Sequence, residues 1–305
     1  MRTRLSWPLA AASLLLALAG SGCRPQAPAA ADAAAASPPE LAVAGAVLLD
    51  GLGDYRFPVT SSHPEVQRWF DQGLALTWGF NHDAAERAFL KATELDPQCA
   101  MCWWGASLVL GPHVNAGMDP ADHADAWERL QRARELAPNA STREQAFIQA
   151  LSARYAQQPG DDRRELDQAY AEATRRLLQQ RPDDLDAAVL HAEALMDLQP
   201  WAYYDEQLRP QGHTAEIVST LESVMARNPD HAGALHLYVH AVEASADPQR
   251  GVEAADRLRG LVPGSGHLVH MPSHIYARVG RWQDAVLANQ RAIEADDAYL
   301  AVCRG

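Results

Sequence analysis

Apolar and small residues recur every three or four positions in the segment 66–97, which reads VQRWFDQGLALTWGFNHDAAERAFLKATELDP. This spacing places them on one face of a helix, so that the opposite face meets water. The segment ends at Pro97, which cannot continue a helix because it has no amide hydrogen. We therefore predict a unit of two amphipathic helices, with small residues where the helices cross.

The unit repeats along the chain. The prolines that end successive units stand 41, 44, 47 and 34 residues apart, and an aspartate replaces the proline after a further 34 residues. These residues are Pro97, Pro138, Pro182, Pro229, Pro263 and Asp297. The excess over 34 residues, which is 7, 10 and 13, is interpreted as loops inserted in the second to fourth units.

The repeat resembles the tetratricopeptide repeat (TPR) family. Counted from Val66, the residues that match the TPR signature are Trp69, Gly73, Ala85, Phe89, Ala92 and Pro97. The stretches FDQGLALTWGFNHDAAERAFLKATELDPQCAMCWWG and HMPSHIYARVGRWQDAV are also similar to exported bacterial TPR proteins without a settled function. The resemblance implies an all-α fold, a right-handed superhelical solenoid of about six helix-turn-helix repeats that stack because no pair buries its apolar face alone.

The sequence before the array predicts export. Residues 1–22 have a basic start and a short apolar run, as in a signal peptide; residues 23–45 form a Pro/Ala-rich linker and residues 46–65 a lead-in. Cys23 resembles the lipidated cysteine of bacterial lipoproteins, but Gly20 stands where leucine is usual, so lipidation and simple cleavage both stay open. We expect a periplasmic protein or a membrane-anchored lipoprotein, with membrane contact only through Cys23.

The TPR array is expected to span residues 66–305 and to be truncated at its C-terminal end. After Asp297, the residues AYLAVCRG resemble the opening of another first helix, with Cys303 at its fourth position. Solenoids usually finish with a polar capping helix. The last helix is therefore predicted either to belong to a longer array or to depend on a partner.

Charge and motifs narrow the function. The formal net charge of −13 would repel a phosphate backbone, so nucleic acid is not an expected partner. The chain contains no G-x-S-x-G elbow, P-loop, H-E-x-x-H motif or dinucleotide fingerprint, which favours a binding protein over an enzyme. The leading hypothesis is a scaffold that binds a protein, a peptide or a small ligand, with no cofactor.

Histidines recur at matching positions in the last two repeats. His236 and His240 take positions 5 and 9 of the fifth repeat, and His270 and His274 take the same positions of the sixth. The TPR resemblance implies that these positions line the concave groove. The groove would also receive His267, Glu243 and Glu193, at positions 2, 12 and 9 of their repeats.

Three interpretations of this histidine grid stay open. In the leading hypothesis the imidazoles contact the bound ligand, and in a second interpretation they only pack between helices. In the alternative, His236, His240, His270 and His274 bind a transition metal such as Zn, Cu, Ni or Fe, because imidazoles one helical turn apart can hold one ion. Pro272 at position 7 predicts a kink or a late helix start, which affects where His267 points.

Two further features qualify these hypotheses. The loop of the fourth repeat carries Trp201, Tyr203 and Tyr204, which could cover a bound ligand or fix the loop to the scaffold. Cys99 and Cys102 form a C-x-x-C pair without the histidine that haem attachment requires. We predict a local disulfide between them.

Overall fold

The computed structural model describes residues 45–160 and 162–303. The predicted signal peptide, nearly all of the linker and the candidate lipidation residue Cys23 lie outside the described residues. Within the described part of the chain, no helix combines the length and the apolar character needed to cross a bilayer.

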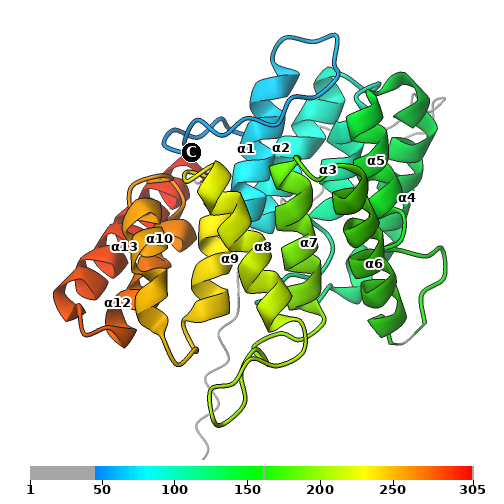
Figure 1. The fold of residues 1–305 in the computed structure, drawn as a ribbon. Helices are drawn as coiled ribbons and strands as arrows, with labels where there is room; N and C mark the ends of the chain where they lie inside the picture. Colours follow the sequence, from blue (N-terminus) through cyan, green and yellow to red (C-terminus); the bar gives the residue numbers. More distant parts are fainter. Residues whose placement is uncertain (1–44, 161, 304–305) are drawn as a thin grey trace, which may run out of the picture. The chain divides into compact units, whose positions relative to one another are not determined.

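The predicted all-α repeat fold is confirmed: six successive helix pairs follow the six predicted repeats (Figure 1). The pairs are α1 (Val66–Trp78) with α2 (His82–Leu95), α3 (Ala100–Leu108) with α4 (His123–Leu136), α5 (Thr142–Leu151) with α6 (Arg164–Gln180), α7 (Leu185–Asp197) with α8 (Thr214–Arg227), α9 (Ala232–Val242) with α10 (Val252–Leu258), and α11 (Gly266–His270) plus α12 (Pro272–Arg278) with α13 (Trp282–Cys303). Short 3-10 turns lie at Pro120–Asp122, Ala137–Asn139 and Pro248–Gly251.

Small residues allow the helices to cross closely, as the repeat pattern predicts. The ring of Phe89 lies between Gly73 of α1 and Gly105 of α3, and a Cβ atom at either glycine would stand 2.7 Å or 2.5 Å from that ring. Both distances are shorter than van der Waals contact, so neither glycine can be replaced without moving a helix. The signature residues Gly73 and Phe89 therefore share one packing contact with Gly105 of the next repeat.

The predicted insertions in the second to fourth repeats are present as loops between paired helices. Their described residues are 109–122, 152–160 with 162–163, and 198–213. Arg154, which is 3% exposed, ties the first two loops together because its guanidinium donates to the carbonyl oxygens of Leu108 and Pro112.

The lead-in segment 46–65 packs against the first three repeats. Phe57 is 1% exposed, and its ring centroid lies 5.5 Å from that of Phe70, 6.3 Å from Trp104 and 5.3 Å from Phe147. The amide of Thr60 donates to Glu144 of α5 at 2.6 Å. The chain itself therefore fills the inner side of the first three repeats.

The first repeat also reaches the fifth. Helix α1 contacts α9, and a Cβ atom at Gly233 of α9 would stand 2.7 Å from the indole of Trp78. The lead-in meets the sixth repeat as well, because the amide of Gly264 donates to the carbonyl of Gly51 at 2.8 Å. These contacts bring residues more than 150 positions apart in the sequence to one place.

The C-terminal expectation is wrong in one respect. Helix α13 continues without interruption through Asp297 to Cys303, so the residues after Asp297 do not open a new helix. An aspartate keeps its backbone N–H and can continue the hydrogen-bond ladder that a proline would end. The expected break at Pro272 is present: α11 ends at His270 and α12 begins at Pro272, with Met271 between them.

Candidate metal centre

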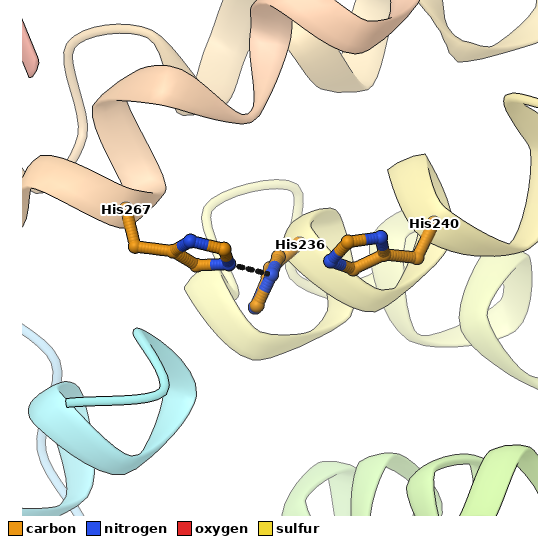
Figure 2. A group of neighbouring side chains, drawn as sticks. All are labelled: His236, His240 and His267. Carbon is orange, nitrogen blue, oxygen red and sulfur yellow. Dashed lines mark hydrogen bonds between the residues drawn. The ribbon is translucent and has the colours of Figure 1, made fainter. Parts of the chain in front are cut away.

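Three imidazoles converge where α9 meets α11 (Figure 2). One ring nitrogen from each of His236, His240 and His267 lies within 4.8 Å of the other two. The Nε2 atoms of His236 and His267 are 3.0 Å apart. Two of the rings come from successive turns of α9, and the third comes from the first turn of α11.

The carbonyl oxygen of Trp78 determines which ring nitrogen of His236 carries the hydrogen. Its ring is fully buried, and Nδ1 donates to the carbonyl oxygen of Trp78 at 2.6 Å, since a carbonyl can only accept. In the neutral ring, Nε2 therefore presents a lone pair to His267. Burial, with the neighbouring imidazoles as a smaller cause, holds the pKa of His236 well below its usual value.

His240 has the least satisfied ring of the three. It is 1% exposed, Nδ1 lies 3.5 Å from Oε1 of Glu243, and Nε2 has no hydrogen-bond partner among the described residues. Burial lowers the pKa of His240 in spite of the nearby carboxylate. Burial opposes the charge of Glu243, yet the His240 imidazole at 3.5 Å and the hydrogen bond from His274 outweigh burial and lower the pKa of that carboxyl to about 2.

His267 connects the buried pair to solvent. Its ring is half-buried and borders a cleft of about 610 Å³, which His113, His270, Asn289 and Asp296 also line. Burial and the nearby imidazoles lower the pKa of His267 to about 3. At neutral pH the three imidazoles are therefore uncharged, which is the state in which imidazole binds a metal.

His270 and His274 form a second pair next to these three. Their Nε2 atoms are 2.9 Å apart, while the Nδ1 atoms contact Asn289 Oδ1 and Glu243 Oε2, each at 2.8 Å. The ring centroids of His240 and His274 are 5.7 Å apart. Glu243 thus contacts one imidazole from each group.

The expected two-by-two grid is shifted by one helical turn. Position 5 of the fifth repeat, His236, faces position 2 of the sixth, His267, and not His270. Position 12, Glu243, likewise faces position 9, His274. Each position of α9 therefore faces the position three lower in the sixth repeat. As a result His267, at position 2, lies beside His236 in the centre of the cluster.

Three aromatic residues that the sequence pattern does not indicate complete the centre. The ring centroid of Phe80 lies 4.5 Å from His236, 5.3 Å from His267 and 4.4 Å from His113, and the rings of His82 and His113 are 4.5 Å apart. Burial lowers the pKa of His82 to about 4 and that of His113 to about 3. Neither occupies an inner helix position, and only the return of the first repeat to the fifth brings them here.

Two residues with a strained backbone contact the imidazoles. Phe80 has φ of 54° and Trp201 has φ of 62°, a left-handed conformation that is unfavourable for large side chains. Trp201 stands edge-on to His240 with 5.2 Å between centroids and is 53% exposed. Both residues meet the histidines from loops, where strain commonly marks functional sites.

The other predicted residues of the fourth repeat do not join the centre. Tyr203 is 2% exposed, and the Tyr204 hydroxyl donates to the carbonyl of Ala241 at 2.9 Å, so both fix the loop to the scaffold. Glu193 is buried near Arg154, and burial raises its pKa to about 7 against the opposing charge of that arginine. In this loop only Trp201 covers the histidines.

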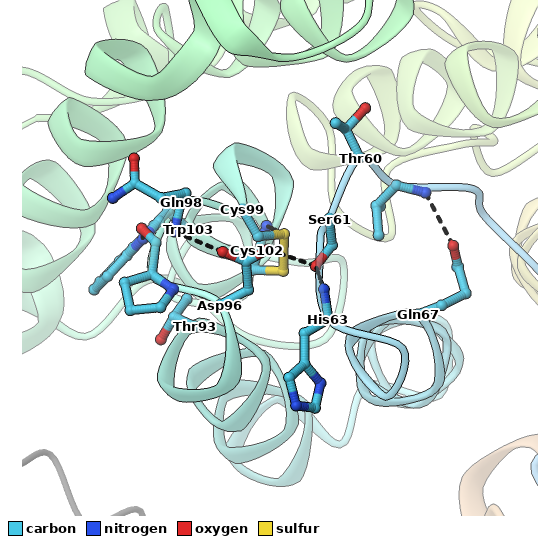
Figure 3. Close-up of a disulfide and its surroundings, with 12 residues drawn as sticks. Thr60, Ser61, His63, Gln67, Thr93, Asp96, Gln98, Cys99, Cys102 and Trp103 are labelled. Atoms are coloured by element: carbon cyan, nitrogen blue, oxygen red, sulfur yellow. Dashed lines mark hydrogen bonds between the residues drawn. A yellow bond between two sulfur atoms is a disulfide. The ribbon is translucent and has the colours of Figure 1, made fainter.

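The cysteine pair lies in a different environment. A disulfide joins Cys99 and Cys102 at the start of α3, beside Ser61 and His63 of the lead-in (Figure 3). Asp96 accepts from the Ser61 hydroxyl at 2.6 Å in the same turn. The disulfide therefore lies where the lead-in crosses the turn between the first two repeats.

Known proteins resemble this chain only weakly. No protein-family model matches the sequence, and no curated protein matches it. Similar solved structures include a crystal structure of MamA (12% identity, 76% of this chain and 98% of that chain, TM-score 0.37) and MamA 41-end from Desulfovibrio magneticus RS-1 (12%, 78% and 98%, TM-score 0.35). Another is YrrB, described as a TPR protein with an unusual peptide-binding site (11%, 78% and 89%, TM-score 0.32). At these TM-scores the similarities carry no argument about the site.

Proposed function

We propose that this TPR-type scaffold holds a transition-metal ion through His236, His240 and His267. The observation that carries the proposal is the convergence of three ring nitrogens within 4.8 Å, together with a buried His240 Nε2 that has no partner among the described residues. A buried polar atom without a partner costs about 1–3 kcal/mol, and a metal bond would remove that cost.

The contacts of the ring nitrogens that face away from the proposed ion support metal binding over simple packing. Metal-binding histidines commonly donate their second nitrogen to a carbonyl or a carboxylate, which orients the ring. His236 does so to Trp78, and His240 Nδ1 points to Glu243. The 3.0 Å between two Nε2 atoms fits ligands of one ion at bonds of about 2.0–2.1 Å and an angle of roughly 90°.

Three protein ligands leave a coordination position open to the cleft. Three histidines with a free position are typical of metal sites that bind an exchangeable water or ligand. The half-buried His267 borders the cleft of about 610 Å³, which gives a small ligand a route to the ion. We propose that the predicted ligand binding of this scaffold takes place here, because the chain's own lead-in fills the inner side of the first three repeats.

Metal titration tests the first proposal. Protein purified without an affinity tag and freed of metal by chelation is titrated with Co²⁺, followed by its visible absorption and by elemental analysis. His236→Ala, His240→Ala and His267→Ala should each weaken binding by more than the roughly 10–100-fold loss typical of outer contacts. Azide added to the loaded protein should change the spectrum by entering the open position.

The matched control is His191→Gln. His191 of α7 is also 1% exposed, but its ring nitrogens contact Thr174 at 3.2 Å and Glu216 at 3.3 Å. This variant should bind Co²⁺ as the unmodified protein does. Equal binding by His191→Gln and all three alanine variants would remove the proposal.

Export and protein partners remain proposals as well. We propose that the protein is exported, since its first 22 residues have the pattern of a signal peptide. The mass of the mature protein from a bacterial host would identify the cleavage site and any lipid on Cys23. A protein or peptide partner would reach the histidines only through the cleft, so its binding should depend on His267.

A further inference from the structure

We propose a second metal position, between His270 and His274. This inference deepens the proposed function, since it concerns a neighbouring ion of the same histidine-rich region, but it depends on different ligand atoms. The two Nε2 atoms are 2.9 Å apart on facing rings whose centroids are separated by 4.8 Å. The position would take a borderline transition-metal ion such as Zn²⁺, Co²⁺ or Ni²⁺.

The hydrogen-bond network fixes the protons of His270. The Nδ2 amide of Asn289 donates to the carbonyl of Ala285 at 2.8 Å, which determines that Oδ1 of Asn289 faces the histidine. That oxygen can only accept, so His270 Nδ1 carries a hydrogen and donates at 2.8 Å. The Nε2 atom of the neutral ring therefore presents a lone pair.

The same reasoning holds for His274. Its Nδ1 atom lies 2.8 Å from Oε2 of Glu243, and an ionised carboxylate oxygen can only accept. His274 Nδ1 must donate, and its Nε2 presents a lone pair as well. Two neutral rings would thus direct lone pairs at each other across 2.9 Å, which is repulsive unless a proton or a metal ion lies between them. We propose the metal ion, and the uptake experiment below separates it from a shared proton.

The helix geometry suits a shared cation. The two histidines are one turn apart, at i and i+4, and this spacing is a known way to hold one ion. Pro272 lies between them, at the break between α11 and α12. Both rings are half-buried, and His270 borders the cleft, so an ion could enter from solvent.

Glu243 links this position to the first one. Its Oε2 contacts His274 at 2.8 Å, and its Oε1 lies 3.5 Å from Nδ1 of His240. One carboxylate therefore orients a ligand of each ion. Glu243→Gln should weaken both positions, because an amide presents only one acceptor oxygen to the two rings.

The experiment counts the ions that metal-free, full-length protein takes up from Co²⁺, by elemental analysis after gel filtration. Unmodified protein should hold two equivalents. The double variant His270→Ala/His274→Ala should hold one, and His236→Ala/His267→Ala should also hold one. Loading with ¹¹³Cd²⁺ gives a second measurement, in which two resonances are expected and each double variant should lose a different one.

The outcomes separate the two proposals. If the unmodified protein takes up only one equivalent and His270→Ala/His274→Ala still holds it, the second position is overturned and the first is left. If the unmodified protein takes up only one equivalent and only His270→Ala/His274→Ala loses it, the first position is overturned and the second is left. Far-ultraviolet circular dichroism checks that each variant is folded, and single His270→Gln and His274→Gln variants replace any double variant that is not; undiminished uptake in both glutamine variants would overturn the second position.

Discussion

The inner side of the helix array has two parts that use equivalent positions for different chemistry. Position 5 is Phe70 in the first repeat and Trp104 in the second, and both pack around Phe57 of the lead-in. The same position is His236 in the fifth repeat and His270 in the sixth. One part is filled by apolar rings, whereas the other part holds imidazoles beside a cleft.

The difference shows how a repeat scaffold divides stability from binding. The rings of the aromatic part are stabilised by packing contact and need no hydrogen-bond partner. The histidine part contains a buried ring nitrogen without a partner and strained loop residues that face it. The two parts meet where the carbonyl of Trp78, at the end of α1, accepts from His236. The apolar part therefore orients the metal centre.

Removing the central ring of the aromatic part should have the largest effect. Phe57→Ala leaves a cavity among Phe70, Trp104 and Phe147 and should lower the free energy of unfolding by about 3–5 kcal/mol. Chemical denaturation followed by tryptophan fluorescence measures the change. Val47→Ala is the control, because Val47 is 42% exposed and should change stability by less than about 0.5 kcal/mol. Equal stability of both variants would contradict a core role for the lead-in.

The junction between the two parts should respond in both stability and metal affinity. Gly233→Ala places a Cβ atom 2.7 Å from the Trp78 indole and should force α9 away from α1, at a cost of about 1–3 kcal/mol. The shift would also misplace His236, so Co²⁺ affinity should fall. Gly260→Ala is the matched control, since its Cβ atom would meet nothing within 4 Å. Loss of stability with unchanged affinity would show that the junction does not orient the metal centre.

The sequence could predict the repeats because helical spacing and terminal prolines are local features. The six helix pairs, the three inserted loops and the break at Pro272 all follow from such features. The continuation of α13 past Asp297 did not follow, because repeat spacing treated an aspartate as equivalent to a proline. Local patterns thus predict the order of the helices and loops. The prediction is wrong where aspartate replaces the proline that ends the other repeats.

The candidate site was only partly predictable, for a geometric reason. Equal positions in neighbouring repeats suggested the histidines, but the slide of one turn between α9 and α11 depends on packing. The contribution of Phe80 and His113 depends on the return of the first repeat to the fifth, which no short-range pattern encodes. Long-range closure therefore has to be read from the structure.

Acid should destabilise the metal-free histidine part before the aromatic part. Burial lowers the pKa of His82 to about 4 in the folded protein. In the unfolded chain the pKa of His82 is about 6.5, so between these two pH values the unfolded chain binds a proton that the folded protein does not. Its stability contribution is full above pH ~6.5 and is lost as the pH falls toward ~4. Between pH 7 and pH 5 the loss should be about 1–2 kcal/mol, allowing for partial exposure.

Denaturation of metal-free protein at a series of pH values measures this effect. His82→Gln should lose less stability between pH 7 and pH 5 than the unmodified protein. The comparison in the aromatic part is Glu144→Gln, because hydrogen bonds from Ser141 and Thr60 outweigh burial and lower the pKa of Glu144. That carboxylate stabilises the fold above the unfolded-state pKa of about 4.3, and its contribution is lost only below it. Identical pH profiles for the two variants would contradict the distinction between the parts.

The smallest effect is expected at the exposed edge of the histidine part. Trp201 and Leu208 lie in one loop with φ of 62° and 58°, and both are about half exposed, at 53% and 47%. Glycine accepts this conformation without strain, so Trp201→Gly and Leu208→Gly should each change stability by no more than about 1 kcal/mol. The ring of Trp201 contacts that of His240, with 5.2 Å between the centroids. Trp201→Gly should therefore release Co²⁺ to a chelator faster than the unmodified protein, whereas Leu208→Gly should not. Equal release rates for the two variants would mean that the indole does not cover the metal centre.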